Sequence, residues 1–391
     1  MHEKPSDLDP ARAGTVIVGM SGGVDSAVAA LRLLERGYAV QGLFMSNWDE
    51  DDAYCTAAAD YQDARRVCEI LRIALHRANF AADYRHRVFS HFLRVYAAGG
   101  TPNPDVLCNR EIKFGVCLEH MRRLGAAWVA TGHYARIEHG AFASRLLKAA
   151  DPAKDQSYFL HAVDASALPR MLFPIGDLEK TEVRRRAHAA GLPVHDKPDS
   201  TGICFIGERP FAEFLGRYIA PSPGPIETED GRVLGEHRGL PFYTLGQRAG
   251  LRLGGRAGAR AAPWYVAAKD TARNALTVVQ SQDHPLLLCD AFEVIEVNWL
   301  VPPAGATSLA CAVKTRHRQA DLPCRLHLRA DGRVDVSLLT AARAVTPGQY
   351  AVFYDGDVCL GGGTIVSRPA RAQIPAEPAI AYNSAFSTEE S

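Results

Sequence analysis

The stretch TVIVGMSGGVDS, residues 15–26, decides how the rest of the chain is interpreted. Its first four residues are β-branched, which predicts a short buried strand. A glycine-rich turn, residues 19–23, follows directly, and an amphipathic helix is predicted over residues 26–36. Glycines let backbone N–H groups approach a phosphate closely, and a helix N-terminus adds partial positive charge. The stretch therefore predicts an anion cradle, although an ordinary strand-to-helix turn would also use glycines.

The glycine-rich turn differs from two common nucleotide-binding patterns. It has no lysine followed by serine or threonine, because Asp25 and Ser26 open the helix, and it lacks the GxGxxG spacing of dinucleotide folds. GMSGGVDS, residues 19–26, instead resembles the PP-loop of ATP pyrophosphatases, which cleave ATP between the α and β phosphates. In such a loop the departing pyrophosphate would be held by the turn. Asp25 would position Mg²⁺ or the nucleotide, and Ser26 would cap the helix or donate to a phosphate.

Strands and helices alternate over the N-terminal part of the chain. Strands are predicted over residues 38–45, 73–80 and 128–131, and helices over residues 57–71, 84–97, 110–124 and 180–190. This alternation predicts an α/β fold with a doubly wound parallel sheet, in which ligands bind at the carboxyl ends of the strands. We expect Met45, Cys108, Gly132 and His133 to lie with the glycine-rich turn at that edge.

The composition changes near residues 208–225, where Pro221, Pro223 and Pro225 occur among glycines. Short strands and turns are predicted from there to about residue 282. Beyond it, apolar and polar residues alternate and Asp331-Gly332 gives a hairpin signal, which predicts a small antiparallel β-barrel. The predicted organisation is a flexible arm at 1–13, a PP-loop ATP pyrophosphatase domain at 14–207, a small central domain at 208–284, the barrel at 285–368 and a disordered tail at 369–391.

Composition argues against several classes of protein. The chain has 391 residues with 44 basic and 44 acidic side chains, so its zero net charge argues against non-specific coating of nucleic acid. No apolar run approaches the ~18–20 residues of a membrane span, and the polar N-terminus gives no sign of secretion. Nine cysteines occur without a CxxC spacing, which disfavours a zinc ribbon and favours a reducing, cytoplasmic location.

Cys108 and Cys204 lie in polar segments bounded by Gly, Pro and Asp. A loop position gives the solvent access that a thiolate nucleophile requires, and the helix start predicted beside Cys108 would make its thiol more reactive. Two reactive thiols beside an ATP pyrophosphatase loop predict sulfur transfer, in which one carries a persulfide and the other resolves it as a disulfide. No third ligand cysteine is evident, which favours chemistry without an iron–sulfur cluster. Structural burial is predicted for Cys68, Cys117, Cys289, Cys311, Cys324 and Cys359, and Cys55 fits neither group.

Other polar features keep two interpretations each. The acidic run NWDEDDAY, residues 47–54, is either a solvated loop or the rim of a Mg²⁺ site. His133 is either functional or a satisfied structural histidine, and the three arginines at 184–186 are more typical of a solvated helix face than of an RNA contact. Arg316 and His317 are predicted on a barrel strand, where the pattern is equally compatible with RNA binding and with a structural role.

Together the motifs resemble one family, the bacterial tRNA-specific 2-thiouridylases. The strings that carry the resemblance are GMSGGVDS (19–26), GLFMSNWDEDDAYC (42–55), TPNPDVLCNREIKF (101–114), ATGHYAR (130–136), KDQSYFL (154–160), FPIGDLEKTEVR (173–184), DSTGICFIGER (199–209), GEHRGLPFYTLGQRAGL (235–251) and TPGQYAVFYDGDVCLGGGTI (346–365). They cover nearly all of residues 14–368, and only the glycine-rich stretch 252–262 and the two tails fall outside them. The family pattern of PP-loop domain, central domain and C-terminal barrel agrees with the composition change.

The resemblance implies an activity. Family members use ATP to adenylate the C2 oxygen of the wobble uridine, position 34, in certain tRNAs, and persulfide sulfur then displaces AMP. Cys204 matches the persulfide-carrying cysteine and Cys108 its partner, so a Cys108–Cys204 disulfide is left to be reduced. The target base would have to flip out of its loop to reach an enclosed site. The implied cofactors and partners are ATP with Mg²⁺, tRNAs for Lys, Glu and Gln, and a persulfide donor or relay protein, with no iron–sulfur cluster and no membrane.

The same resemblance implies roles for individual residues. Catalytic roles are implied for Cys108, Cys204 and Asp25. ATP contacts are implied for Gly19, Met20, Ser21, Gly22, Gly23, Val24, Asp25, Ser26, Met45 and Gly132. Contacts with the target base are implied for Asn103, Pro104 and Asp105. Contacts with tRNA are implied for His133, Lys154, Asp155, Gln156, Arg316, His317 and Gln349.

Two other functions stay open at this point. A PP-loop amide ligase would need neither the cysteine pair nor tRNA, and its pyrophosphate release would not depend on tRNA. An RNA-binding module with a vestigial nucleotide site would release no pyrophosphate, and the intact SGGVDS string and both cysteines count against it.

Overall fold

The computed structural model describes residues 14–48, 57–140, 142–199, 211–253 and 262–369. The predicted N-terminal arm, most of the acidic run, Cys55, Cys204 and all but the first residue of the predicted tail lie outside the described residues. The glycine-rich turn and Cys108 lie within them.

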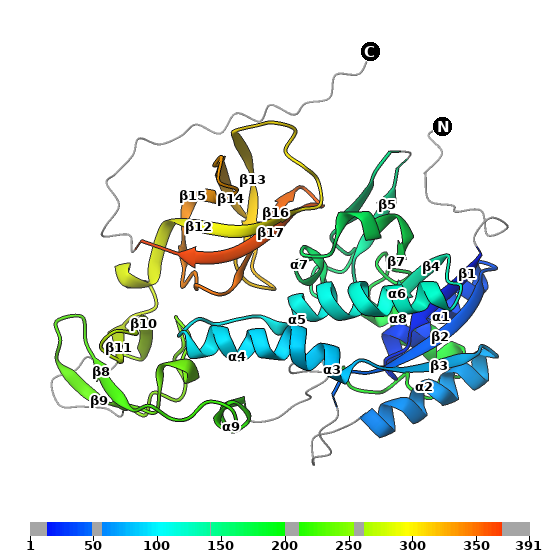
Figure 1. The fold of residues 1–391 in the computed structure, drawn as a ribbon, viewed down its shortest axis with the longest axis horizontal. Coiled ribbons are helices and arrows are strands. Elements are labelled where there is room, and N and C mark those ends of the chain that lie inside the picture. The colour runs from blue at the N-terminus through cyan, green and yellow to red at the C-terminus, as the bar shows by residue number, and fades with distance from the viewer. Residues whose placement is uncertain (1–13, 49–56, 141, 200–210, 254–261, 370–391) are drawn as a thin grey trace.

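A five-stranded sheet lies at the centre of the N-terminal part, with strands in the order β3-β2-β1-β4-β7 (Figure 1). Its strands are β1 (Thr15–Gly19), β2 (Ala39–Ser46), β3 (Leu75–Asn79), β4 (Trp128–Thr131) and β7 (Met171–Leu172), and every pairing between them is parallel. The side chains of β1 alternate between two cores, because Val16 and Val18 pack in one and Ile17 packs in the other. The predicted doubly wound sheet is therefore confirmed.

Helices cover both faces of this sheet. The face of Val16 and Val18 is covered by α1 (Val24–Glu35), α2 (Ala57–Leu71) and α8 (Lys180–Ala189). The face of Ile17 is covered by two long helical runs. The first run consists of α3 (Ala81–Tyr84), η2 (Arg85–Phe89) and α4 (Ser90–Ala97). The second run consists of α5 (Pro104–Leu107), η3 (Cys108–Val116) and α6 (Cys117–Arg123).

The second of these runs begins earlier than predicted. The sequence pattern predicts a helix from Arg110, but the helical backbone already begins at Pro104. Proline suits the first turn of a helix, and the Asn103 side chain caps this one by accepting a hydrogen bond from Asp105 N at 3.1 Å. Cys108 therefore lies inside a continuous helical run and not in a loop before it.

A hairpin that the sequence did not predict joins the N-terminal part to the barrel. It consists of β5 (Arg136–His139) and β6 (Ser144–Leu147), and β6 pairs with β17 through Leu147 and Val358. The short helices α7 (Ser157–Leu160) and η4 (Ala165–Arg170) follow it. The two parts thus share one eight-stranded sheet.

The central part is small and mostly stranded, as predicted. It begins with α9 (Phe211–Gly216) and contains a four-stranded sheet in the order β10-β11-β8-β9. The strands of this sheet are β8 (Gly224–Glu227), β9 (Val233–His237), β10 (Trp264–Asp270) and β11 (Ala275–Gln280). Two short helices, η5 (Leu240–Phe242) and η6 (Pro285–Leu287), complete the central part.

The C-terminal part is the predicted antiparallel barrel. Its strands are β12 (Leu288–Trp299), β13 (Ser308–Lys314), β14 (Leu322–Leu328), β15 (Val334–Arg343), β16 (Tyr350–Asp355) and β17 (Val358–Ser367), and pairing of β12 with β17 closes it. The prediction that Arg316 and His317 lie on a strand is wrong. Strand β13 ends at Lys314, and the Gln319 side chain closes a turn by accepting from Thr315 N at 2.8 Å.

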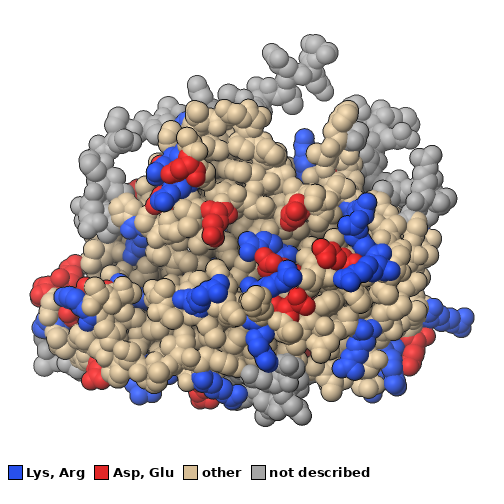
Figure 2. Space-filling view, in the orientation of Figure 1, with Lys and Arg blue, Asp and Glu red and all other residues tan. Residues whose placement is uncertain are grey.

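The distribution of charged side chains and the lengths of the apolar helices agree with what the composition predicts. Figure 2 shows basic and acidic side chains interspersed over one face of the molecule, without a large area of one sign. Among the described residues, no helix is both long enough and apolar enough to cross a lipid bilayer.

Candidate nucleotide and sulfur-transfer site

The turn between β1 and α1 is held in shape by its own serines. Helix α1 begins at Val24, two residues before the predicted start, so Ser26 lies in its first turn. The Ser26 hydroxyl donates to Gly23 O at 3.1 Å and accepts from Ser21 N at 3.1 Å. Below the turn, Met20 is buried and its N–H donates to Leu43 O of β2 at 2.9 Å. The loop is therefore preformed, with Ser21 exposed at its surface.

Two glycines let neighbouring backbone come close to this turn. Gly22 has a φ of +77°, and a Cβ there would lie 2.3 Å from Asp60 O of α2. Gly132 follows β4, and a Cβ there would lie 2.6 Å from Ser26 N. Only glycine fits at either position, and the end of β4 lies directly against the N-terminus of α1.

The ends of three neighbouring strands meet at this edge of the sheet. A Cβ built on Gly19 would lie 3.6 Å from both Met45 Cε and Thr131 Cγ2. The structure thus brings together Gly19, Met45 and Gly132, which the sequence analysis assigned to ATP. This is the edge at which doubly wound sheets bind their ligands.

Asp25 is paired with a lysine that sequence reasoning missed. Lys180, the first residue of α8, places its Nζ 2.7 Å from Asp25 Oδ1 and 2.7 Å from Asp199 Oδ1. Tyr134 also donates to Asp25 Oδ1 at 2.8 Å, and burial together with Asp25 raises the pKa of Tyr134 well above its usual value. Lys180 lies within the FPIGDLEKTEVR string, but nothing local in that string pairs it with Asp25.

Asp199, five residues before Cys204 in the sequence, forms ion pairs with several basic side chains. Its carboxylate also pairs with Lys154 Nζ at 2.7 Å and Arg184 Nη2 at 3.0 Å. Burial opposes ionisation here, but the hydrogen bonds from Lys154 and Lys180 prevail and lower the pKa of Asp199 to about 2. Arg184 is therefore part of an ionic network, unlike the exposed Arg185, which pairs with Glu182 of its own helix.

Lys197 holds the glycine-rich turn against α2. Its Nζ donates to Gly22 O at 3.0 Å, to Asp60 at 2.7 Å and to Asp63 at 2.6 Å. Burial works against the charge, but both carboxylates raise the pKa of Lys197. Sequence reasoning also missed this residue, because the ion pairs span more than 130 positions along the chain.

Asp155 and Gln156, assigned to tRNA by the sequence, lie in internal contacts. Asp155 is 5% exposed, and its carboxylate accepts from Ala149 N at 3.1 Å and Ser157 Oγ at 3.0 Å. His317 Nε2 of the barrel lies 2.9 Å from Asp155 O. Gln156 Oε1 accepts from Tyr134 N at 2.9 Å. These residues therefore hold the N-terminal part, the loop after β4 and the barrel together.

The remaining residues assigned to tRNA are also partly engaged. His133 is buried, with Nδ1 2.7 Å from Thr131 Oγ1, and burial followed by Lys113 lowers the pKa of His133 well below its usual value. Arg316 donates to Ala344 O at 2.5 Å, and Gln349 Nε2 donates to Thr101 O at 2.7 Å. Gln349 thus anchors the loop that leads to Asn103 and Pro104.

The thiol of Cys108 is not where the sequence placed it. Cys108 is 0% exposed, within an apolar cluster that includes Leu107, Phe114 and Tyr158. The expectation of an accessible loop cysteine is therefore wrong for the described structure, because the Asn103 cap starts the helix before Cys108. Cys204 lies outside the described residues, so the structure does not test its position relative to Cys108.

Most of the other cysteines are buried as predicted. Burial raises the pKa to about 11 for Cys68 and Cys289 and to about 12 for Cys117 and Cys359, which suits structural thiols. Cys311 is the exception, since it is only half-buried, with its sulfur 3.6 Å from that of Cys324 on the neighbouring strand.

Asn47 lies at this edge and is the first residue of the run that the sequence assigns either to a solvated loop or to the rim of a Mg²⁺ site. It follows β2 directly, is 2% exposed, and neither atom of its side-chain amide has a hydrogen-bond partner among the described residues. An unpaired buried amide is costly, and such groups gather at binding sites. Its signals in the sequence are its place at the start of the 47–54 run and its position two residues after Met45. In the part of the chain that the structure describes, no three His, Cys, Asp or Glu side chains gather as a metal-binding group.

Comparisons with known proteins agree with this architecture. The family model described as "tRNA methyl transferase HUP domain" matches residues 14–208. The models described as "tRNA methyl transferase PRC-barrel domain" and "Aminomethyltransferase beta-barrel domain" match residues 212–280 and 289–365. These three matches follow the three parts of the fold.

Solved structures match more weakly. NMN synthetase from Francisella tularensis is 19% identical, covering 49% of this chain and 68% of that chain with a TM-score of 0.32. The U34-tRNA thiolase NcsA from Methanococcus maripaludis, solved with its 4Fe-4S cluster, is 16% identical, covering 49% and 61% with a TM-score of 0.33.

Curated relatives match over almost the whole chain. The tRNA-specific 2-thiouridylase MnmA of Chromohalobacter salexigens is 57% identical over 354 residues, which are 90% of this chain and 92% of the relative. The protein of the same name from Alcanivorax borkumensis is 56% identical over 352 residues, 90% and 96% of the two chains. At this identity and coverage, the chain belongs to the tRNA-specific 2-thiouridylase family.

Proposed function

We propose that this protein converts the wobble uridine of tRNA, position 34, to 2-thiouridine, using ATP and persulfide sulfur. ATP adenylates the C2 oxygen of the uridine and pyrophosphate leaves. Sulfur then replaces the adenylated oxygen, so the products are 2-thiouridine, AMP and pyrophosphate. The single observation that carries the proposal is the preformed loop at the edge of the parallel sheet, where the N-terminus of α1, Gly132 and the Asp25–Lys180 pair meet.

The chemistry of this edge suits a triphosphate. Backbone N–H groups at the start of α1 and the ammonium of Lys180 supply positive charge for phosphate oxygens. Mg²⁺ in such sites is usually held by one or two carboxylates together with substrate phosphates. Asp25 fits this role, since its side chain is 31% exposed and borders the loop. A bound ion would neutralise charge on the phosphates as pyrophosphate departs.

Sulfur transfer is assigned to Cys204 and Cys108. The terminal sulfur of a persulfide on Cys204 attacks C2, a C–S bond forms, and the C–O bond to AMP breaks. The Cys108 thiolate then attacks the Cys204 sulfur, which releases the thiolated base and leaves a Cys108–Cys204 disulfide. Two electrons from an external reductant reopen this disulfide, which suits the cytoplasmic setting expected from the sequence. The buried position of Cys108 means that the helix that carries it must shift during the cycle.

Binding of the RNA is assigned to the remaining predicted residues. The target base is assigned to Asn103, Pro104 and Asp105, at the start of the helix that continues into Cys108. The tRNA body is assigned to the side chains around the barrel junction: His133, Lys154, Asp155, Gln156, Arg316, His317 and Gln349. The expected substrates are the tRNAs for Lys, Glu and Gln, and the expected sulfur source is a persulfide-carrying protein.

The direct test is nucleoside mass spectrometry. Unmodified tRNA is incubated with the protein, ATP, Mg²⁺ and a persulfide donor, then digested, and AMP and pyrophosphate are measured in the same reaction. The expected result is one 2-thiouridine, one AMP and one pyrophosphate per turnover, with no product when ATP is omitted. Pyrophosphate release that proceeds equally without tRNA would overturn the proposal in favour of an amide ligase.

A further inference from the structure

The three parts of the molecule meet around a cavity of about 710 Å³. Its walls come from the end of α4 and the loop 99–101, from β10 of the central part, and from β17 of the barrel with the segment that precedes β16. Cavities of this size are typical of sites for small organic ligands. It is separate from the nucleotide edge of the sheet, which contributes none of its lining residues.

Two partly buried cations line this cavity, and neither has a carboxylate partner in the described part of the chain. Lys269 of β10 donates to Gly99 O at 2.9 Å, and no Asp or Glu among the described residues lies within ion-pair distance of it. Burial lowers the pKa of Lys269 to about 8, which reflects the same lack of compensating charge. Lys269 is only partly exposed, and withdrawing an ammonium ion from water without a counter-ion is costly, so this wall favours a bound anion.

Arg368 supplies the second cation, just after β17. Its Nη2 donates to Ala267 O at 3.0 Å and Leu286 O at 3.1 Å, whereas Nη1 is buried and has no hydrogen-bond partner among the described residues. Ala267 lies two residues before Lys269 on β10, so both cations reach the same stretch of strand.

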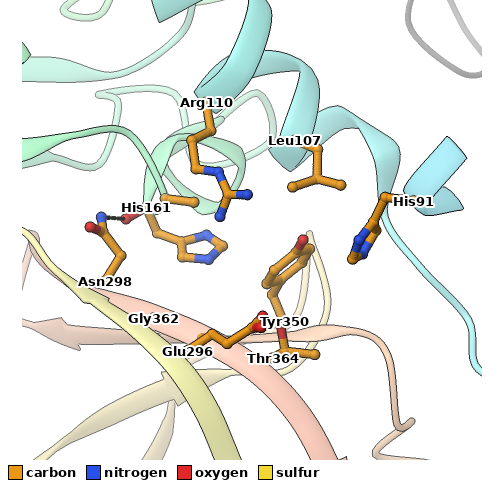
Figure 3. A pocket seen from close by; sticks show the side chains of 11 residues that line it. His91, Leu107, Arg110, His161, Glu296, Asn298, Tyr350, Gly362 and Thr364 are labelled. Carbon is orange, nitrogen blue, oxygen red and sulfur yellow. Dashed lines mark hydrogen bonds between the residues drawn. The ribbon is translucent and has the colours of Figure 1, made fainter. Parts of the chain in front are cut away.

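The rest of the lining is mainly apolar. Its aliphatic lining residues include Val95, Leu245, Leu286, Ile365 and Val366. Glu296 is the one carboxylate among the lining residues, and it lies with His91 and Tyr350 where the cavity borders a much smaller one of about 30 Å³ (Figure 3). The charged groups of the lining are therefore separated: Lys269 and Arg368 lie at the β10 side of the cavity, and Glu296 lies at the side of His91 in α4.

We propose that this three-part cavity binds a small organic anion, with a phosphate or carboxylate at Lys269 and Arg368 and an apolar or aromatic body against the aliphatic lining. The free donor positions of Lys269 hold the charged oxygens, and the positive charge of the Arg368 guanidinium in the same wall favours them. The bound anion bridges the central part and the barrel. Because Lys269 also holds Gly99, the ligand stabilises the loop that leads to Asn103.

Isothermal titration calorimetry on the full chain tests this proposal. The probe is phenyl phosphate, compared with benzoate and with the neutral analogue benzyl alcohol. We expect one saturable site for at least one of the two anions and none for benzyl alcohol. Absence of saturable binding by both anions, or equal binding of the neutral analogue, would overturn the proposal.

Variants locate the bound probe. Lys269→Met and Arg368→Met each remove a charged hydrogen bond and are expected to weaken binding by about tenfold to a hundredfold. Ala98→Trp adds an indole at an exposed lining position and is expected to abolish binding. The control Arg325→Met removes one positive charge from an exposed site on β14 outside the cavity and is expected to change nothing.

Folding is controlled separately. Thermal melting of each variant shows whether it is folded, and Arg368→Lys, which keeps the charge, is expected to restore part of the affinity lost in Arg368→Met. Binding that persists unchanged in both methionine variants would place the probe elsewhere and refute the assignment. None of these measurements uses tRNA or ATP, so their outcome is independent of the proposed thiolation.

Discussion

The loop edge of the parallel sheet and the helix that carries Cys108 lie in the same N-terminal part but are built in opposite ways. At the loop edge, Ser21 is exposed, the Asp25 side chain is 31% exposed, and ionic contacts from Lys180 and Lys197 hold the backbone in place. Cys108 is 0% exposed within an apolar cluster. We call the loop edge the nucleotide half and the helix that carries Cys108 the thiol half. The nucleotide half is preformed, whereas the thiol half is enclosed and would have to open for the proposed sulfur transfer.

The Cys108 helix has a feature that suits such a change. The segment η3 (Cys108–Val116) is a π-helix, and Gly115 within it has φ −102° and ψ −107°, which are not helical values. A Cβ on Gly115 would lie 2.8 Å from Arg110 O, so the kink depends on glycine. π-helical segments are less regular than α-helices and occur often at functional sites. Substitutions confined to the nucleotide half or to the thiol half show what each contributes to ATP binding and to thiolation.

Gly132→Ala is expected to have the largest effect. The added methyl group would lie 2.6 Å from Ser26 N and push β4 away from the start of α1. We expect ATP affinity, measured by calorimetry, to fall by about a hundredfold or more, since a main-chain cradle cannot adapt by side-chain rotation. Gly216→Ala is the control, because a Cβ there would meet nothing within 4 Å. Unchanged ATP affinity in Gly132→Ala would contradict the position assigned to the nucleotide.

Lys180→Met is expected to have the next largest effect. It removes the ammonium that pairs with Asp25 and Asp199, so Asp25 loses its cationic partner beside the loop, whereas Asp199 keeps Lys154 and Arg184. We expect tRNA-dependent pyrophosphate release to fall by about tenfold or more, as for loss of one charged contact. Arg185→Met on the same helix is the control, because Arg185 is exposed and pairs with Glu182. Equal rates for the two variants would mean that Lys180 has no part in the nucleotide half.

Lys197→Met is expected to act more weakly. It frees Gly22 O and separates the loop from Asp60 and Asp63, but the serine hydrogen bonds within the loop remain. We expect a few-fold loss of ATP affinity, because the loop becomes less ordered without losing a phosphate contact. Arg65→Met, on the exposed face of α2, provides the comparison. A loss as large as that of Gly132→Ala would show that Lys197 contacts the nucleotide itself.

Asp199 predicts a dependence of stability on pH. Its pKa is about 2 in the folded chain, against about 3.9 in an unfolded one, so its ionic contacts stabilise the fold fully above pH 4. This contribution is lost as the pH falls from about 4 toward 2. In urea denaturation, Asp199→Asn should therefore be less stable than the native chain at pH 7, with a gap that narrows below pH 4. Asp196→Asn, at a side chain that is 89% exposed, should show no such gap.

Sequence reasoning succeeded where the signal is local or periodic. The strand, glycine turn and helix of residues 15–35 follow from residue type, and the alternation of strands and helices gives the doubly wound sheet. The alternating pattern of the last third gives the barrel. The start of α5 also has a local signal, since Asn103-Pro104-Asp105 carries a cap and a first-turn proline, but prolines that follow glycines are equally typical of a loop.

Contacts between distant residues could not be predicted in this way. Lys180 and Asp25 lie 155 positions apart, and only the packing of α8 beside α1 brings them together. The β5–β6 hairpin joins the barrel through one cross-strand pair, which has no signature in either strand. The burial of Cys108 depends on tertiary packing around α5 and η3, whereas its flanking polar residues suggested exposure.

Cys108→Ser, followed by two readouts on one preparation, shows whether nucleotide binding and sulfur transfer depend on different residues. Calorimetry gives the affinity for ATP, and nucleoside mass spectrometry gives the 2-thiouridine formed with tRNA and a persulfide donor. We expect ATP affinity within about twofold of the native chain, because the nucleotide half is built without Cys108, and no 2-thiouridine above background. Thiolation at the native rate by Cys108→Ser, or loss of ATP binding together with thiolation, would contradict this expectation.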